Sequence, residues 1–457
     1  MIIKDCIIWH CYAEEKGGGV YIENSDIHME NTKVGINTTG TDILKSRGGG
    51  IYLYHSSPLM IDVDMKYNEA MIGGGLYASG SSPTIIKSAI SDNISNAGGG
   101  ALVFHDSGHV VLENNLFYGN EANGSGGAIA FLEGIHAELN ACSFLFNISS
   151  SSVYLADGGA VFISPYDNEV IIKNCEFTSN RSGDFGGAIY AASETYLVNC
   201  QFGDNRGTGL FGGGGAVAVM QSSLISLNCT FCLNNSPNGT SLYCEDSEST
   251  LLNSIIWDGP LIEGNKVILA GYETNSVINI DHCDIEGGMD HIDGIGNYSI
   301  NWMKGNINDN PNFVSALPDV SLKWNSPCIN AGRSDTLLLL IPPYDFSGHQ
   351  RIIGGEIDMG CYEYQGPNRI PEISKEEQFV VYPNPATDHF YLKNISQADF
   401  EGRMRLTDLS GKLLIENKLI VPAKGIFLQS LLGLVSGYYI IQLDSPGYSA
   451  QQKIIVW

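Results

Sequence analysis

The stretch from Cys175 to Ile189, CEFTSNRSGDFGGAI, decides the fold of this chain. It contains two short motifs, Phe-x-x-Asn at 177–180 and Gly-Gly-Ala-Ile at 186–189, and both recur along the sequence. The glycine motif has eight copies, whose last glycines are residues 19, 50, 75, 100, 127, 159, 187 and 215. A repeat of 25 to 32 residues is the length of one unit in a stacked array. The spacing therefore predicts a solenoid rather than an ordinary globular core.

The Phe-x-x-Asn motif lies between the glycine motifs, with copies that begin at Phe117, Phe144, Phe177, Phe202 and Phe231. A cysteine stands two residues before four of these phenylalanines, at 142, 175, 200 and 229, and Cys6 and Cys283 hold the same place before Ile8 and Ile285. Residues two apart lie on the same face of a strand. We therefore predict inward ladders of Phe and Cys, together with stacked Asn side chains that hydrogen-bond along the rod.

Each repeat unit has the composition of short strands joined by turns. Glycine permits the positive φ needed at the corner of a coil, and β-branched and aromatic residues dominate between the turns. One such unit cannot bury its own apolar face, whereas stacked units can. The pattern predicts an all-β parallel β-helix. It leaves open which face of the strand after the glycines points inward, because residues 128–131 are apolar on both sides.

Charge differs between the two parts of the chain. Of 50 acidic and 24 basic residues, only 8 and 7 lie in residues 376–457, so residues 1–375 carry a net charge of −25. Such a body repels nucleic acid and anionic polysaccharide, and leaves neutral glycans, cations and other proteins as partners. The alternative is that the charge only keeps a long secreted rod soluble. No apolar run is long enough for a transmembrane helix.

The two ends of the chain differ in character. The start, Met1 to Cys6, lacks the features of a signal peptide and reads as the middle of a repeat, so we expect a fragment of a longer precursor. At the other end the glycine repeat is lost after a Pro-containing linker, and short strands alternate with turn signals. We predict repeats over residues 1–260, terminal coils and an end cap over 261–364, a linker over 365–375 and a small Ig-like β-sandwich over 376–457.

The order of motifs in the last segment resembles the type A sorting domain of the type IX secretion system of Bacteroidetes. The matching positions are Tyr382-Pro383-Asn384-Pro385, the turn at Gly411-Lys412, Gly437 and Tyr439, and the final strand from Lys453. The resemblance implies export through the outer membrane by the type IX machinery, removal of this domain and attachment to surface lipopolysaccharide. The alternative is an ordinary Ig-like module without a sorting role.

The Gly-Gly-Ala-Ile and Phe-x-x-Asn motifs resemble the repeats of chlamydial polymorphic outer-membrane proteins and of other secreted bacterial right-handed parallel β-helix proteins. Residues 253–363 resemble the closing segment of a β-helix family that precedes C-terminal surface anchors. These resemblances imply a secreted or cell-surface protein. They do not select a function, because this fold carries adhesins and polysaccharide-cleaving enzymes alike.

Several groups of residues are candidates for chemistry. Asp62 and Asp64, on one strand face opposite Ile61 and Val63, form a candidate carboxylate pair, although solvated outer-face acids are the simpler interpretation. A Cys328–Cys361 disulfide is possible in an exported protein, whereas Cys229-x-x-Cys232 lacks a second pair for zinc. The densest acidic cluster, which oxygen-loving Ca²⁺ would suit, comprises Asp281, His282, Asp284, Glu286, Asp290, His291 and Asp293.

None of these groups forms a convergent catalytic set in the sequence. Basic residues before position 376 are few and scattered, and none recurs beside an acidic ladder as a polysaccharide lyase would require. We therefore expect no catalytic residues, no cofactor and no metal site, and a non-enzymatic scaffold that binds glycans or host or bacterial surface proteins. A polysaccharide lyase or glycoside hydrolase with a groove along one strand face is the alternative.

Overall fold

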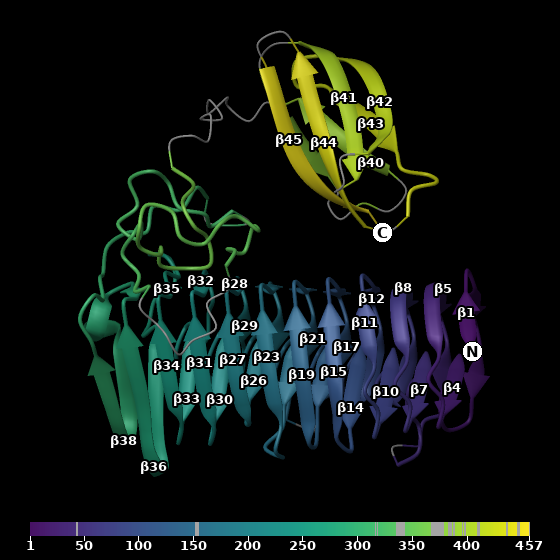
Figure 1. The fold of residues 1–457 in the computed structure, drawn as a ribbon, viewed down its shortest axis with the longest axis horizontal. Helices are drawn as coiled ribbons and strands as arrows, with labels where there is room; N and C mark the ends of the chain where they lie inside the picture. The colour runs from purple at the N-terminus through teal and green to yellow at the C-terminus, as the bar shows by residue number, and fades with distance from the viewer. Residues whose placement is uncertain are drawn as a thin grey trace. The chain divides into compact units, whose positions relative to one another are not determined.

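The computed structural model describes residues 1–42, 44–150, 155–315, 317, 319–334 and 343–366, and in the C-terminal part 379–382, 386, 389–394, 396, 399–408, 412–435, 437–445 and 448–456. The chain forms two compact units, Met1–Gly366 and Pro367–Trp457. The first unit is a parallel β-solenoid of about eleven turns, in which strands of successive coils lie side by side along the rod (Figure 1). The predicted all-β architecture is confirmed.

Three strands of each coil stack into continuous parallel faces, and the strands that follow the glycines form the first face. They are β4 (Val20–Glu23), β7 (Ile51–Tyr54), β10 (Leu76–Ser79), β14 (Leu102–His105), β18 (Ile129–Phe131), β22 (Val161–Ile163), β26 (Ile189–Ala191), β30 (Val217–Met220) and β33 (Leu242–Glu245). Of the apolar residues in β18, Ile129 and Phe131 point into the main core and Ala130 lies in a separate outer cluster. This settles the face that the sequence left open.

The second face contains β1 (Ile2–Lys4), β11 (Thr84–Ile86), β15 (Gly108–Glu113), β19 (Ile135–Asn140), β23 (Glu169–Lys173), β27 (Glu194–Val198), β31 (Ser223–Leu227) and β34 (Glu248–Leu252). The third face contains β2 (Ile7–Trp9), β12 (Ala89–Ser91), β16 (Leu116–Tyr118), β20 (Ser143–Leu145), β24 (Glu176–Thr178), β28 (Gln201–Gly203), β32 (Thr230–Cys232), β35 (Ile255–Ile256) and β37 (Asp284–Ile285). Two long strands, β5 (His28–Gly35) and β8 (Leu59–Lys66), run across both faces.

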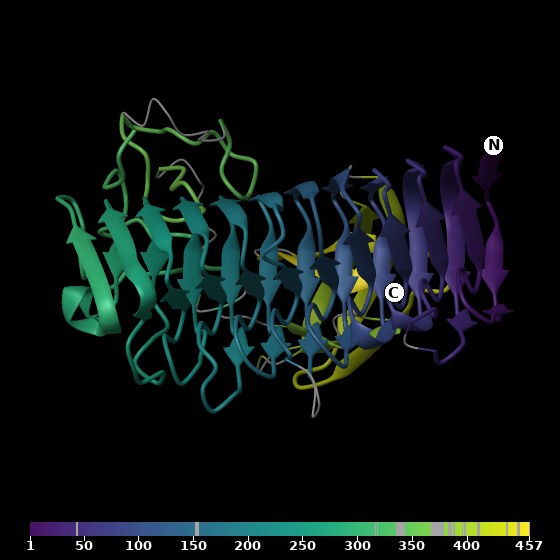
Figure 2. The ribbon, with the colours of Figure 1, turned by 90° about the horizontal axis from the view of Figure 1, so that it is seen from below.

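Short strands before each glycine motif form an additional parallel sheet. They are β3 (Tyr12–Ala13), β6 (Thr38–Thr39), β9 (Glu69–Ile72), β13 (Ile94–Gly98), β17 (Glu121–Ala122), β21 (Ile148–Ser149), β25 (Arg181–Ser182) and β29 (Arg206–Gly207). Part of the variation in repeat length falls after this sheet, where loops such as 208–213 project from one edge of the rod (Figure 2). Insertions there leave the stacked strands undisturbed.

The Phe-x-x-Asn motif builds two internal ladders. The five phenylalanines are fully buried, and their rings stack in parallel with centroids 4.7 to 4.9 Å apart. In the neighbouring ladder the Nδ2 of Asn147 donates to Oδ1 of Asn180 at 3.0 Å and to the carbonyl of Phe117 at 3.0 Å. The same pattern runs from Asn37 to Asn234 and ends on the buried carboxylate of Asp258. Each buried amide therefore satisfies backbone groups that a corner would otherwise leave unpaired.

Glycine is required where coils approach most closely. The φ of Gly186 is +65°, and a Cβ at Gly187 would lie 2.0 Å from the carbonyl oxygen of Gly215 in the next coil. Because that oxygen belongs to the backbone, no side-chain movement could relieve the clash. The two glycines thus have different roles, a left-handed corner and a close approach between coils.

The predicted cysteine ladder exists in the core. Cys142, Cys175, Cys200, Cys229 and Cys283 are buried, whereas Cys6, in the first coil, is only half-buried. The Sγ of Cys175 accepts the backbone N–H of Cys142 at 3.4 Å. A polar side chain is thus useful at this position, and Ser254 occupies it between Cys229 and Cys283.

Residues 261–364 complete the last coils, but the chain that follows these coils does not cover the end of the rod as predicted. The last coils are formed by β36 (Val267–Asp281), the 3₁₀ helix η1 (Gly288–His291) and β38 (Ile292–Trp302). The following chain lies along the third face: the Cys361 N–H donates to Thr230 Oγ1 at 3.0 Å, and Leu322 and Met359 share an apolar cluster with Ile255. Gly203 on β28 faces Leu317, Ile255 on β35 packs in the apolar cluster, and Gln201 Oε1 accepts the Tyr362 hydroxyl at 2.9 Å, so this segment covers the third face rather than the end of the rod.

The C-terminal unit contains two antiparallel sheets. One comprises β39 (Phe379–Tyr382), β40 (His389–Asn394) and β43 (Ile426–Ser430), and the other β42 (Leu413–Val421), β41 (Phe400–Asp408), β44 (Gly437–Ser445) and β45 (Tyr448–Val456). One apolar cluster, which includes Phe390, Met404 and Ile454, draws side chains from both sheets. This is the arrangement of a small β-sandwich, as predicted.

Candidate functional site

Aromatic side chains, two of them exposed and one half-buried, follow one corner of the solenoid beside the third face. We call Tyr67, Tyr118 and Phe146 the aromatic strip. Tyr67 and Phe146 occupy the same corner position three coils apart, with φ of +55° and +56°, and are 54% and 47% exposed. Tyr118 stands one residue before this corner, and its ring centroid is 5.6 Å from that of Phe146. Burial raises the pKa of the Tyr118 phenol, with smaller contributions from Asp92 and Tyr67.

A tryptophan extends the strip toward the first coils. Trp9 lies over Gly35 of the next coil, where a Cβ would be 2.4 Å from the indole Cζ3. The Nζ of Lys66 lies 5.9 Å from the indole ring centroid and 3.3 Å from Asp64 Oδ2. The absence of a side chain at position 35 thus allows a large aromatic surface to lie flat on the rod.

The candidate carboxylate pair is not arranged as the sequence suggested. Asp62 has a φ of +54° and forms a corner between two faces, so the alternation assumed over residues 61–64 is broken there. Met60, Val63 and Met65 point inward, whereas Ile61, predicted to lie opposite the acids with Val63, is only half-buried. Burial and then the charge of Asp64 raise the pKa of Asp62. Because Asp64 is paired with Lys66, the two acids have different environments and do not form a symmetric catalytic pair.

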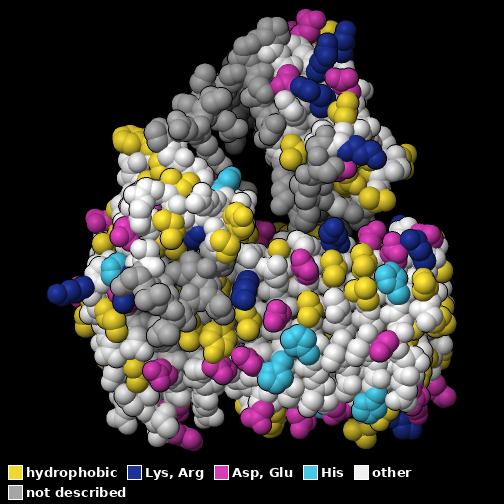
Figure 3. Space-filling model, viewed as in Figure 1, with side chains coloured by type: hydrophobic (Ala, Val, Ile, Leu, Met, Phe, Trp, Pro, Cys, Tyr) yellow, Lys and Arg dark blue, Asp and Glu magenta, His cyan; other side chains and the backbone are white. Residues whose placement is uncertain are grey.

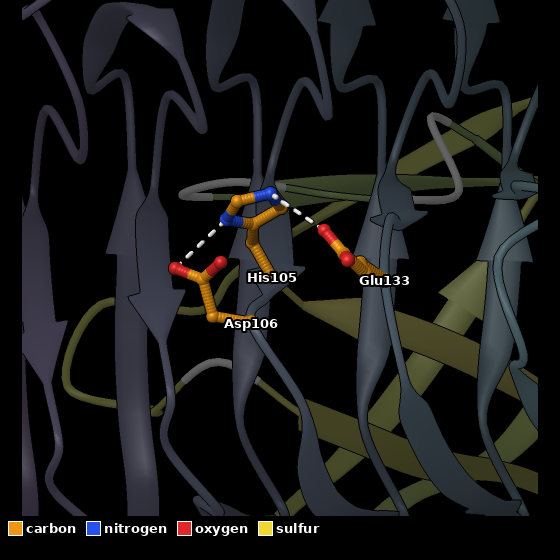
Figure 4. A group of neighbouring side chains, drawn as sticks. All are labelled: His105, Asp106 and Glu133. Carbon is orange, nitrogen blue, oxygen red and sulfur yellow. Dashed lines mark ion pairs between the residues drawn. The ribbon is translucent and has the colours of Figure 1, made fainter.

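A second cluster, which the sequence did not reveal, lies where β14 ends. His105 stands between two carboxylates: its Nδ1 is 3.0 Å from Asp106 Oδ2 and its Nε2 is 3.7 Å from Glu133 Oε2 (Figure 4). Among the described residues these three form the only group of His, Cys, Asp or Glu close enough to hold one metal ion. The spacing could have indicated this contact, because Glu133 follows Asp106 by 27 residues, which is the local repeat length. It was missed because neither residue belongs to a recurrent motif.

The cysteine candidates form no disulfide in the structure. All eleven cysteines are free, so the considered Cys328–Cys361 disulfide is wrong. Cys328 instead contacts an acid, because its Sγ donates to Asp284 Oδ2 at 3.1 Å in a buried hydrogen bond. Cys229 and Cys232 are buried, and the Cys229 Sγ donates to the Leu227 carbonyl at 3.4 Å.

The acidic cluster at residues 281–293 does not converge on a common centre. Asp281 pairs with Arg333 at 2.8 Å and with His282 at 2.7 Å, and Glu286 pairs with the buried Lys266 at 2.9 Å. Asp290 and Asp293 are exposed on η1 and β38. The ion pairs of Asp281 and Glu286 hold the terminal coils together and join them to the segment along the third face.

Asp284 makes stability depend on pH. Burial raises its pKa to about 7, although hydrogen bonds from Cys328 and the Asp309 N–H oppose the rise. In the unfolded chain the pKa of an Asp is about 4. Between these values the folded protein holds a proton that the unfolded chain has released, so this group's contribution to the free energy of unfolding falls as pH rises through the interval and is constant above it.

We therefore expect Asp284→Asn to flatten part of the pH dependence. Chemical denaturation of the wild type should show stability falling from about pH 4 to about pH 7, and the difference from the variant should reach at most about 4 kcal/mol. Asp290→Asn, at an exposed acid, is the matched control and should retain the wild-type slope. Identical slopes for wild type and Asp284→Asn would show that Asp284 titrates normally.

The sorting-domain positions are described only in part. Lys412 is exposed, Gly437 is half-buried at the start of β44, and Tyr439 is buried with its hydroxyl donating to the Val435 carbonyl at 2.6 Å. Tyr382 and Lys453 lie on β39 and β45, where their backbones are described. Pro383, Asn384, Pro385 and Gly411 lie outside the described residues.

Family models match a segment in each of the two parts of the chain. Residues 1–144 match the family described as right handed beta helix region, and residues 380–457 match the secretion system C-terminal sorting domain. No curated protein and no solved structure gave a match. None of the helices in the described part of the chain is long and apolar enough to cross a membrane. The protein is a secreted or cell-surface β-helix protein that uses the type IX secretion machinery.

Proposed function

We propose that the β-helix is a non-enzymatic binding scaffold displayed at the cell surface, and that the aromatic strip is its contact surface for a neutral glycan or a surface protein. The observation that carries this proposal is the exposure of Tyr67 and Phe146 at one corner of the solenoid, with the Tyr118 ring packed against that of Phe146. Large rings held in place bury much area at little entropic cost, which makes them favoured anchors in binding sites.

The surrounding charge favours neutral or cationic ligands. Asp92 occupies the same corner row between Tyr67 and Phe146, and Asp64 lies near the extension at Trp9. Carboxylates near exposed rings suit hydroxyl donors on a sugar or basic groups on a protein. Acidic and basic side chains are dispersed over the face of the solenoid that Figure 3 shows.

A binding and turnover experiment tests the proposal. The full chain is screened against arrays of neutral and acidic glycans and of cell-surface proteins, and the affinity for the best ligand is measured for Tyr67→Ala and Phe146→Ala. Each substitution should weaken binding at least tenfold, about 1.4 kcal/mol, because it removes an anchor. Tyr166→Ala, at a tyrosine that is 62% exposed away from the strip, should bind normally.

The same samples distinguish binding from catalysis. Polysaccharides incubated with the protein are assayed for new reducing ends and for unsaturated products, and we expect neither. Turnover that disappears in Asp62→Asn or Asp64→Asn would instead establish an enzyme with a groove along the third face. Equal affinities for the strip variants and the wild type would place the binding surface elsewhere.

We further propose that the sorting domain is read through Tyr382, Pro383, Asn384, Pro385, Gly411, Lys412, Gly437, Tyr439 and Lys453, and that surface lipopolysaccharide is the attachment site after export. The exposure of Lys412 supports a contact with another molecule, whereas the hydrogen bond from the Tyr439 hydroxyl to the Val435 carbonyl supports a role for Tyr439 in holding β44. Lys412 is therefore the position at which recognition can be separated from folding.

A further inference from the structure

We propose that His105 and Glu133 bind a divalent transition-metal ion of the Zn²⁺ class, with Asp106 as the residue that orients the imidazole. The inference is independent of the aromatic strip, which lies beside a different face. It rests on the positions of three side chains and on the distances between their polar atoms.

Strand register brings the three residues together. β14 pairs with β18 so that Phe104 is opposite Phe131, which places Asp106 beside Glu133 in the next coil. The Ser107 N–H donates to the Glu133 carbonyl at 2.8 Å, so both turns are tied to each other. Asp106 and Ser107 have φ of +63° and +62°. The turn made by these two left-handed residues places the Asp106 carboxylate beside the ring of His105.

The hydrogen bonds define which ring nitrogen is available. Asp106 Oδ2 accepts the hydroxyl of Ser79 and lies 3.0 Å from His105 Nδ1, which leaves Nε2 as the ring nitrogen that faces Glu133 and could contact a metal ion. A carboxylate on one nitrogen and a metal on the other is the usual arrangement of a metal-binding histidine, because the carboxylate fixes the tautomer and raises ligand basicity.

The gap between Nε2 and Glu133 fits an ion. The 3.7 Å separation is too long for a hydrogen bond, whereas Zn²⁺ bonds of roughly 2.0 to 2.2 Å to nitrogen and oxygen span it with a bent angle. The side chains are 31% and 62% exposed, which leaves the remaining coordination positions open to water. An imidazole with a carboxylate suits borderline transition metals better than Ca²⁺ or Mg²⁺, which prefer oxygen alone.

A neighbouring pair provides the contrast. His136 Nδ1 lies 3.1 Å from Glu169 Oε2, which is a direct contact with no space for an ion, and no second carboxylate is in contact with that ring among the described residues. His136 is also more exposed, at 61%. It is therefore the matched control for a histidine that merely pairs with an acid on the outside of the rod.

Calorimetric titration of ZnCl₂ into the full chain, first freed of metal by a chelator and then dialysed, tests the proposal. The wild type should bind Zn²⁺, His105→Asn and Glu133→Gln should each weaken binding at least tenfold, and Asp106→Asn should weaken it about tenfold to a hundredfold. His136→Asn should bind as the wild type does. Co²⁺ in place of Zn²⁺ should give a visible absorption spectrum that His105→Asn abolishes.

Three outcomes would overturn the proposal. The wild type could fail to bind ZnCl₂, binding could be unchanged in His105→Asn, or CaCl₂ could displace Zn²⁺ at equal concentration. The first would mean that His105 only bridges two carboxylates, the second that the metal lies elsewhere, and the third that the acids alone hold a hard cation. Circular dichroism of every variant establishes that the solenoid is intact before the affinities are compared.

Discussion

A protein that lacks residues 376–457 will not reach the cell surface. We expect this result when the truncated and complete chains are expressed with the same export signal in a bacterium that has a type IX secretion machinery. The matched sorting family covers residues 380–457, and the contact boundary between the two units lies at 366–367, so the deletion removes the sorting signal and leaves the solenoid's packing intact. The truncated solenoid should accumulate in the periplasm, folded and resistant to protease, while the complete chain is accessible to protease on whole cells.

A pair of single substitutions refines this experiment. Lys412→Ala removes an exposed side chain at a proposed recognition position, and Lys418→Ala removes an exposed lysine on β42 outside it. Display should fall for the first and stay normal for the second. Normal display of Lys412→Ala would remove this residue from the recognition set, whereas normal display of the truncated chain would contradict the sorting role itself.

Replacing Phe177 by Ala should destabilise the middle of the solenoid by about 3–5 kcal/mol. The ring is fully buried and stacks between Phe144 at 4.7 Å and Phe202 at 4.9 Å, so its removal leaves a cavity and deprives two neighbours of a stacking partner. The coils above and below cannot close this cavity, because their spacing is held by parallel strand pairing and by the Asn ladder.

The loss should be local, since each coil contacts mainly its neighbours. Hydrogen exchange should therefore accelerate in β20, β24 and β28 before it changes in the first coils, and denaturant unfolding should shift to lower concentration. Phe146→Ala is the matched control: the same truncation at a ring that is 47% exposed should cost less than about 1 kcal/mol. Equal costs at both positions would contradict the inward stacking of the Phe ladder.

The solenoid could be predicted from the sequence because its motifs repeat. One copy of Phe-x-x-Asn indicates little. Five copies at the spacing of the glycine motif indicate that each copy occupies the same position in successive coils, and the coils must stack because a single coil cannot bury its apolar face. The roles of the buried Phe, Asn and Cys residues were predictable for this reason. The second part of the chain was recognisable as a sandwich from strand and turn signals, although its register was not.

Single-copy features were less predictable. The left-handed corner at Asp62 breaks the alternation expected along this strand, so the orientation inferred for Ile61 was wrong, whereas Asp62 is exposed as expected for an outer-face acid. Cys328 and Cys361 appeared suitable for a disulfide only because their partners, Asp284 and the chain around Thr230, are remote in sequence. The segment after β38 covers the third face through contacts such as those of Cys361 with Thr230 and of Tyr362 with Gln201, which join residues remote in sequence, so no local pattern predicts them.

The sequence alone therefore determined the class of fold, the ladders and the two-part organisation, because each depends on local periodicity or on a motif that repeats. Only the tertiary structure decided which residues meet on the outside. The aromatic strip joins positions from three coils, and the cluster of His105, Asp106 and Glu133 joins two turns whose φ angles and register set its distances. Outer side chains are not constrained by stacking, so their order along the chain is irregular, and their neighbours are defined only once the coils are in register.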